Sequence, residues 1–239
     1  MEKLDILAFA AHPDDVELAC AGSIILEVKK GRNVGIVDLT AGELGTRGNK
    51  VLRLREVEAA SKVLGISIRE NLGFRDCFFQ DDEEHQLEVV KMIRKYRPDV
   101  IICNAVSDRH PDHGKASSLV LKAAFLSRLP KLETSLLGSS QSAWNPRAVY
   151  HYIQDRYHRP DFVIDVTSVW EERIKAMMAF SSQFYNPDSA EPETPISTKN
   201  FLDFVEGRAL EFGKPAGFRY GEGFMVSRIP GVTDLLQLL

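Results

Sequence analysis

The chain has 239 residues, of which 44% are hydrophobic and 27% charged, the balance of an ordinary globular protein. Its formal net charge of −4 leaves no basic excess to neutralise phosphates, so we expect no nucleic-acid partner. No segment approaches the roughly 18 uninterrupted apolar residues of a membrane span, and the first ten residues lack a secretory signal, so we expect a cytoplasmic protein without a membrane partner.

Strand and helix patterns alternate over the first half of the chain. Short apolar runs predict strands at residues 4–11, 33–40, 66–72 and 100–103. Apolar residues at helical spacing predict helices at residues 16–30, 51–64, 86–96 and 115–127. This alternation predicts an α/β fold, with a mostly parallel sheet that carries helices on both faces.

The second half of the chain is less regular. We expect strands at residues 148–154 and 162–166, helices at 169–180 and 200–210, and a long surface loop at 181–198. Because no linker interrupts the chain, we expect one domain over residues 1–239. Residues 1–130 would form its core, and residues 131–239 would complete the site.

The three cysteines are Cys20, Cys77 and Cys103, an odd number spread far apart in the sequence. Each lies beside apolar residues. We therefore expect buried free thiols in a reducing compartment.

Two histidine–carboxylate clusters stand out, at residues 12–15 (HPDD) and 110–113 (HPDH). Each follows directly after a strand that we expect in the parallel sheet. In an open α/β sheet, ligands bind in the crevice outside the carboxyl ends of the strands. The two clusters should therefore meet in space.

His12, Asp15 and His113 are the candidate metal ligands in these clusters. Two histidines and a carboxylate suit Zn²⁺ and leave a position open for water, as in catalytic sites. We expect one zinc ion per chain, although iron also accepts this ligand set.

The remaining polar residues of the clusters can move protons. Asp14 is placed to take a proton from water as general base. His110 would face the developing oxyanion and protonate the leaving amine, and Asp112 could hold the ring of His110.

Each cluster, taken singly, also has a structural interpretation. Asp14 and Asp15 before an apolar run are typical of a helix N-cap, and His-Pro-Asp is a common surface turn. The placement of both clusters at strand ends favours function over structure. The other histidines, His85, His151 and His158, lack such a context and are expected to be plain surface or strand residues.

These motifs resemble the LmbE-like, or PIG-L, de-N-acetylases. The shared segments are residues 11–15 (AHPDD), 40–48 (TAGELGTRG), 73–76 (GFRD) and 110–113 (HPDH), together with Arg53 and Glu56 in the second helix. The resemblance implies a Rossmann-like sheet and a substrate that contains N-acetylglucosamine. It also implies His12, Asp15 and His113 as zinc ligands, Asp14 as base and His110 as oxyanion partner.

Within the family, the size of the chain and its segment 214–224 are similar to the deacetylase of bacillithiol biosynthesis. That resemblance implies N-acetylglucosaminyl malate as substrate and an assembly of several copies. Arg53 and Arg109 are the candidates for binding the malyl carboxylates, because guanidinium groups pair bidentately with carboxylates. Asp76 is a candidate for binding sugar hydroxyls, again by resemblance, and a deacetylase of another N-acetylglucosamine derivative is the alternative.

Two other classes of protein fit parts of the pattern. A dinucleotide-binding protein would share the fold, but the first strand here leads into His-Pro-Asp-Asp in place of a glycine-rich turn. A metal-containing sugar-binding module would have no need for Asp14. Both alternatives are therefore less favoured than an enzyme.

Overall fold

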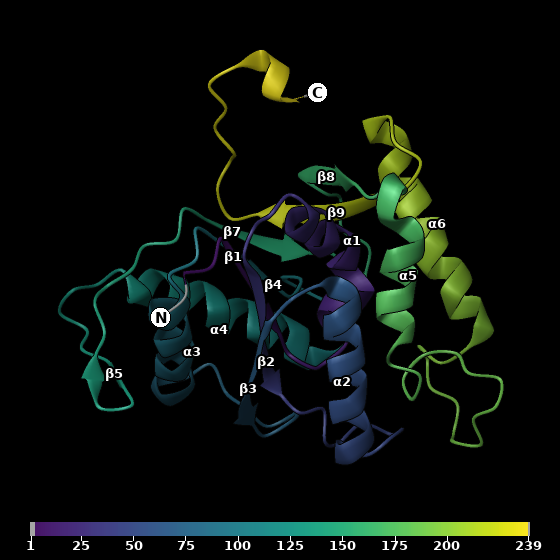
Figure 1. Cartoon of the computed structure of the whole chain (residues 1–239), viewed down its shortest axis with the longest axis horizontal. Coiled ribbons are helices and arrows are strands. Elements are labelled where there is room, and N and C mark those ends of the chain that lie inside the picture. The colour runs from purple at the N-terminus through teal and green to yellow at the C-terminus, as the bar shows by residue number, and fades with distance from the viewer. Residues whose placement is uncertain (1–2, 239) are drawn as a thin grey trace.

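The computed structural model describes residues 3–238 and contains one seven-stranded sheet with the order β3-β2-β1-β4-β7-β9-β8 (Figure 1). The strands are β1 (Ile6–Ala10), β2 (Val34–Thr40), β3 (Ile68–Phe74), β4 (Val100–Cys103), β7 (Ala148–Tyr152), β8 (Phe162–Asp165) and β9 (Gly221–Val226). Strands β3, β2, β1, β4 and β7 pair in parallel, and β9 runs antiparallel to both β7 and β8. The expected α/β fold with a mostly parallel sheet is confirmed.

Helices cover both faces of this sheet (Figure 1). On one face lie α1 (Asp15–Lys29), α2 (Lys50–Leu64), α5 (Trp170–Met178) and α6 (Lys199–Ala216). On the other face lie α3 (Glu83–Tyr96) and α4 (Pro111–Ser127). Short elements complete the chain: β5 (Ser135–Leu136), β6 (Ser139–Ser140), η1 (Thr167–Val169) and η2 (Leu235–Leu238).

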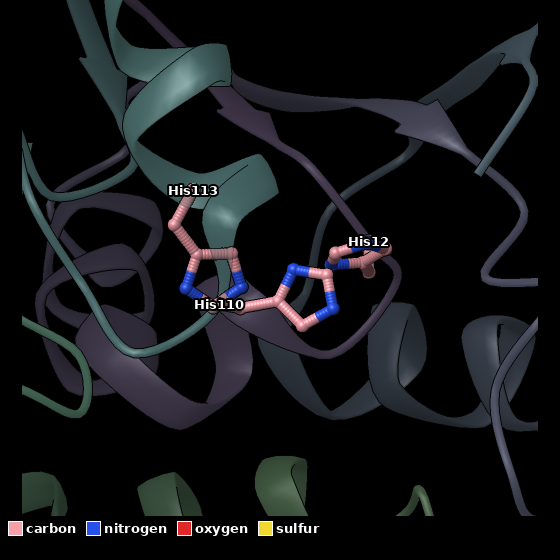
Figure 2. Close-up of side chains that lie close together, drawn as sticks. All are labelled: His12, His110 and His113. Atoms are coloured by element: carbon pink, nitrogen blue, oxygen red, sulfur yellow. The ribbon is translucent and has the colours of Figure 1, made fainter. Parts of the chain in front are cut away.

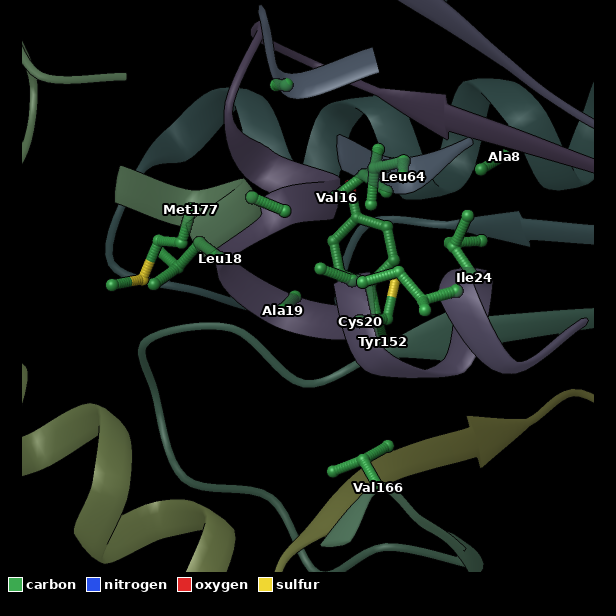
Figure 3. Packing of buried hydrophobic residues seen from close by; sticks show 14 of the residues in the cluster. Ala8, Val16, Leu18, Ala19, Cys20, Ile24, Leu64, Tyr152, Val166 and Met177 are labelled. Atoms are coloured by element: carbon green, nitrogen blue, oxygen red, sulfur yellow. The ribbon is translucent and has the colours of Figure 1, made fainter. Parts of the chain in front are cut away.

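Strand β1 runs through the centre of the core. Its side chains alternate between the two faces: Ala8 and Ala10 pack toward α1, and Leu7 and Phe9 toward α3 and α4. Figure 3 shows the apolar core between the sheet and α1, in which Tyr152 is fully buried among side chains of α1. Burial on both faces explains why the sequence of this strand is continuously apolar.

Strand β9 was not expected, because its sequence Gly-Glu-Gly-Phe lacks a strand pattern. The glycines allow close packing: a Cβ atom on Gly223 would come within 2.9 Å of the Phe212 ring. The carboxylate of Glu222 accepts hydrogen bonds from the backbone N–H groups of Gly22 (2.9 Å) and Ser23 (2.7 Å), next to a kink at Cys20 in α1. Strand β9 therefore satisfies the donors that the kink releases.

Three other expectations need correction. Helix α4 begins at Pro111, four residues earlier than expected, because proline is accommodated in a first helical turn. Helix α6 continues to Ala216, beyond the expected end at residue 210. Cys77 is exposed, whereas Cys20 and Cys103 are buried as expected. Among the described residues, no helix is both long and apolar enough to span a membrane.

Candidate active site

The two histidine clusters meet at the carboxyl ends of β1 and β4, which are neighbours in the sheet. The first cluster forms the turn from β1 into α1, and the second forms the first turn of α4. Figure 2 shows His12, His110 and His113 grouped together, with ring centroids 4.7 Å apart for His12–His110 and 5.2 Å for His110–His113. Residues about a hundred positions apart thus form one site.

Asp15 lies at the centre of this site and is almost completely buried. One carboxylate oxygen accepts from the backbone N–H of His12 and from the side chain of Asn104, both at 2.9 Å. The other accepts from Gln154 at 2.6 Å and lies 3.2 Å from Nε2 of His113. Burial opposes ionisation, but the nearby charge of His113 and its hydrogen bond hold the pKa of Asp15 well below its usual range.

His12 and His113 have similar surroundings: each ring has one nitrogen toward Asp15 and the other toward a second carboxylate. His113 presents Nε2 to Asp15, and its Nδ1 lies 2.7 Å from Asp108. His12 presents Nδ1 toward Asp15 at 3.7 Å, and its Nε2 lies 3.0 Å from Asp76. A ring nitrogen facing the site and a carboxylate behind the other nitrogen is the usual support of a metal-binding histidine.

The charge balance of the site also suits a cation. Burial alone would lower the pKa of His12, but hydrogen bonds to Asp112 and Asp76 raise it to about 10. Burial likewise opposes charge on His113, but Asp15 and Asp108 raise its pKa to about 9. The carboxylates therefore stabilise positive charge where the two rings meet, and a divalent cation could supply that charge.

More than one ligand set is possible at this place. One nitrogen each from His12, His110 and His113 lies within 4.8 Å of the others, and the same holds for ligand atoms of His12, Asp76 and Asp112. These nitrogen and oxygen donors fit zinc or iron.

Asp14 occupies the N-cap position of α1 but does not cap the helix. Its backbone is in the left-handed region with φ of 114°, a costly conformation for a residue with a side chain. Its carboxylate instead lies 3.0 Å from Nη1 of Arg53 and lines the cavity described below. Burial raises the pKa of Asp14 to about 7, although the charge of Arg53 opposes this. Helix capping by the side chain therefore does not explain why an aspartate stands at position 14.

His110 is half-buried, and it accepts a hydrogen bond from the backbone N–H of Asp112 at 3.3 Å. Burial, and the charges of His12 and His113, lower its pKa. We expected the Asp112 carboxylate to hold the ring of His110, but the structure shows other partners for it. It accepts from the backbone of Cys77 (2.9 Å) and from Lys115 (3.0 Å), and approaches Nε2 of His12 (3.4 Å).

A cavity of about 270 Å³ opens over the histidines. Among its lining residues are the predicted Asp14, Arg53, Asp76, Arg109 and His110, and also Thr46, Gln154, Gln183, Thr194 and Ile196.

The candidate substrate-binding residues differ in their surroundings. Arg53 is buried and donates to the backbone carbonyl of Pro13 (2.9 Å) as well as to Asp14. Arg109 is exposed at the rim, where it pairs with Asp155 at 2.8 Å. Asp76 is buried, and its oxygens contact His12 and the backbone N–H of Leu44, so its visible role is to orient His12.

Asn104, Asp108 and Gln154 support the site but were not singled out from the sequence. Asn104 and Asp108 lie in the polar segment between β4 and the second cluster, and that position was an available signal. Gln154 follows β7 at the same edge of the sheet, and nothing in the local sequence distinguishes it.

Comparison with known proteins places these residues in a family. The family model for PIG-L, described as GlcNAc-PI de-N-acetylase, matches residues 7–124. The diacetylchitobiose deacetylase of Thermococcus kodakarensis is 29% identical over 95% of this chain and 84% of its own length. A Bacillus anthracis protein named "Probable N-acetyl-alpha-D-glucosaminyl L-malate deacetylase 2" is 26% identical over 75% of this chain and 81% of its own.

Among solved structures, the conserved protein TT1542 from Thermus thermophilus superimposes with a TM-score of 0.84. It is 32% identical, and the match covers 97% of this chain and 98% of that one. The fold is therefore shared with that protein over nearly the whole chain.

Proposed function

The chain belongs to the PIG-L family of de-N-acetylases, and from that premise we propose that it is a zinc-dependent hydrolase of N-acetylglucosaminyl malate. The coarser activity, removal of an acetyl group from an N-acetylglucosamine-type substrate, follows from the family. The observation that carries the finer proposal is the cavity that joins the histidine cluster to Arg53 and Arg109.

We assign the zinc ligands as His12, Asp15 and His113. The arrangement of the donors supports this set, because both histidines face Asp15 and have a carboxylate on their far nitrogen. Zinc bound by three protein ligands lowers the pKa of a water molecule to about 7 and polarises a carbonyl group.

Asp14 and His110 are assigned the proton transfers of amide hydrolysis. Asp14 accepts a proton from the attacking water, and its pKa of about 7 suits a base that works near neutral pH. The water oxygen bonds to the acetyl carbon, and the C–N bond breaks with its electron pair on nitrogen. His110, which faces the same cavity, gives a proton to that nitrogen, so that acetate and a free amine leave.

The malyl group would meet the guanidinium groups. Arg53 uses one nitrogen, Nη1, for both Asp14 and Pro13, and Arg109 is exposed at the rim beside Asp155. A guanidinium group pairs favourably with a carboxylate, so the two arginines in the cavity wall support a substrate that carries negative charge.

Diacetylchitobiose is the second candidate substrate. The relative that acts on it matches nearly the whole chain, and here each of the two arginines already pairs with a carboxylate of the protein. A neutral disaccharide would need no further cation.

Release of free amine from zinc-loaded protein distinguishes these substrates. We expect a higher kcat/KM for N-acetylglucosaminyl malate than for diacetylchitobiose or N-acetylglucosamine. A preference for diacetylchitobiose would reject the malyl substrate and leave the deacetylase chemistry in place.

A further inference from the structure

The loop 181–198 joins α5 to α6 and lies beside α2 (Figure 1). It contains no helix or strand, yet four of its residues line the cavity over the histidines: Gln183, Thr194, Pro195 and Ile196. Irregular loops of this length inside a compact domain are usually functional or disordered. Such a loop can form a fixed wall of the cavity only where groups outside it hold it in place.

Glu56, a buried residue of α2, holds the beginning of this loop. Its carboxylate accepts from the backbone N–H of Ser182 at 2.6 Å, from the Ser182 hydroxyl at 2.8 Å and from the Ser181 hydroxyl at 3.2 Å. Burial of a carboxylate costs free energy unless hydrogen-bond donors replace the lost water. Within residues 3–238, every hydrogen bond to this carboxylate comes from the loop. The loop therefore supplies the donors that allow Glu56 to be buried, and Glu56 supplies the acceptor that fixes the loop.

The glycine-rich segment after β2 holds the same loop further along. Arg47 donates from Nη2 to the hydroxyl of Ser189 at 2.6 Å, and the backbone N–H of Gly48 donates to the Glu191 carboxylate at 2.8 Å. The side chain of Gln183, one of the cavity-lining residues, donates to the backbone carbonyl of Arg47 at 2.9 Å. The loop is thus attached at its beginning and in its middle.

Gly48 allows the loop to approach this closely. Its φ of 76° lies in the left-handed region that favours glycine. A Cβ atom at this position would come within 2.8 Å of Oγ of Ser182, the residue that Glu56 binds. A side chain at Gly48 would therefore displace the loop without removing its acceptor on α2.

The loop is separate from the groups to which we assign the chemistry. Arg53, one turn before Glu56 on α2, donates to Asp14, whereas Glu56 accepts from the loop. In the part of the chain that the structure describes, no hydrogen bond joins the loop to Asp14 or to the proposed zinc ligands. Release of the loop should therefore change the shape of the cavity and leave the groups that carry out hydrolysis in place.

We propose that Glu56 is a positioning residue for substrate binding: it holds the loop 181–198 as a fixed wall of the cavity, so that the substrate does not have to order the loop when it binds. The proposal rests on the deacetylase activity in the proposed function, and it applies to N-acetylglucosaminyl malate and to diacetylchitobiose alike. Without Glu56 the loop should be in place in only a minor fraction of the molecules. If that fraction is about 1–10%, KM rises by about 10- to 100-fold.

The test measures hydrogen exchange and steady-state kinetics of the zinc-loaded Glu56→Ala protein. Backbone N–H groups in the loop should exchange faster, because Ser182 has lost its acceptor, while exchange in β1 and β4 stays unchanged. For the better of the two conjugates, KM should rise by the 10- to 100-fold given above, with kcat and zinc content retained. A merely structural role gives the opposite pattern, since partial unfolding lowers the active fraction, and with it kcat, at an unchanged KM.

Three further variants sharpen the comparison. Glu56→Gln keeps the shape of the side chain and one oxygen to accept from Ser182, so its KM should lie closer to that of the unmodified protein than to that of Glu56→Ala. Glu58→Ala, at an exposed position of α2, is the matched control and should change neither exchange nor KM. Gly48→Ala should raise KM in the same direction as Glu56→Ala, and it provides the test if Glu56→Ala fails to fold.

The outcomes that would overturn the proposal are distinct from failure of the proposed function. Unchanged exchange of the loop in Glu56→Ala, or faster exchange with KM unchanged for both conjugates, would overturn it. A fall in kcat at an unchanged KM, in Glu56→Ala or in Gly48→Ala, would also overturn it. Failure of the proposed function appears before any variant is compared, as absence of amine release by the unmodified protein.

Discussion

The two ends of the main cavity are built in different ways. At the histidine end, Asp15 is buried and receives hydrogen bonds from His12, Asn104 and Gln154, which come from three separate strand ends. At the rim, Arg109 is 46% exposed and pairs with Asp155, and the loop 181–198 contributes Gln183, Thr194, Pro195 and Ile196 to the wall. In the proposed function the chemistry therefore lies at the strand ends of the sheet, and recognition of the malyl group lies at the exposed rim.

Removal of a metal ligand should have the largest effect. His113→Ala or Asp15→Ala leaves two of the three proposed ligands, so we expect loss of bound zinc and of activity down to background. Metal analysis of the purified variants and an amine-release assay check this. His85→Ala, on the surface of α3, is the matched histidine control and should retain both. Stoichiometric zinc in His113→Ala would reject the ligand assignment.

Loss of the general base should be next in size. Asp14→Asn keeps the shape of the side chain but cannot accept the proton, so turnover should fall by about 10²- to 10⁴-fold with zinc retained. Metal content and kcat, measured on the same sample, give the comparison. Near-normal turnover would show that another residue is the base.

The carboxylates behind the histidines should have an intermediate effect. Asp108→Asn weakens the hydrogen bond to Nδ1 of His113, and we expect zinc affinity to fall by about 10- to 100-fold. Competition with a chelator measures this. Asp99→Asn, at a surface pair with Lys3, is the control, and an equal loss there would show that the effect is not specific to the site.

The smallest effect is expected at the rim. Arg109→Ala should reduce kcat/KM for N-acetylglucosaminyl malate by about 2- to 5-fold, because an exposed ion pair contributes little, and should leave N-acetylglucosamine unaffected. Arg109 is a cleaner test than Arg53, whose contact with Asp14 makes any substitution there affect both substrates. Equal losses on the two substrates would remove Arg109 from recognition of the malyl group.

The histidine end of the cavity is built from residues at strand ends and could be predicted from the sequence, whereas the contacts between distant segments could not. The clusters at 12–15 and 110–113 are short, contiguous and placed at strand ends, so their convergence is predictable from the sequence alone. Asp112 shows the limit: its side-chain direction depends on α4 starting at Pro111, and it turns to His12 and Lys115 and away from His110.

Contacts between distant segments could not be predicted in this way. Gln154 reaches Asp15 from a position 139 residues away, and Ser189 reaches Arg47 from 142 residues away. No local periodicity encodes such a pairing. Strand β9 was missed for a related reason, since its glycines are required by the neighbours it packs against and not by the strand itself.

Amine release from N-acetylglucosaminyl malate, measured with zinc-loaded and chelator-treated protein side by side, tests the central claim most directly. We predict zinc-dependent release that disappears on chelation, returns when zinc is restored, and exceeds release from diacetylchitobiose at equal substrate concentration. Release that persists after complete removal of the metal, or no release from any N-acetylglucosamine substrate by the zinc-loaded protein, would contradict the account.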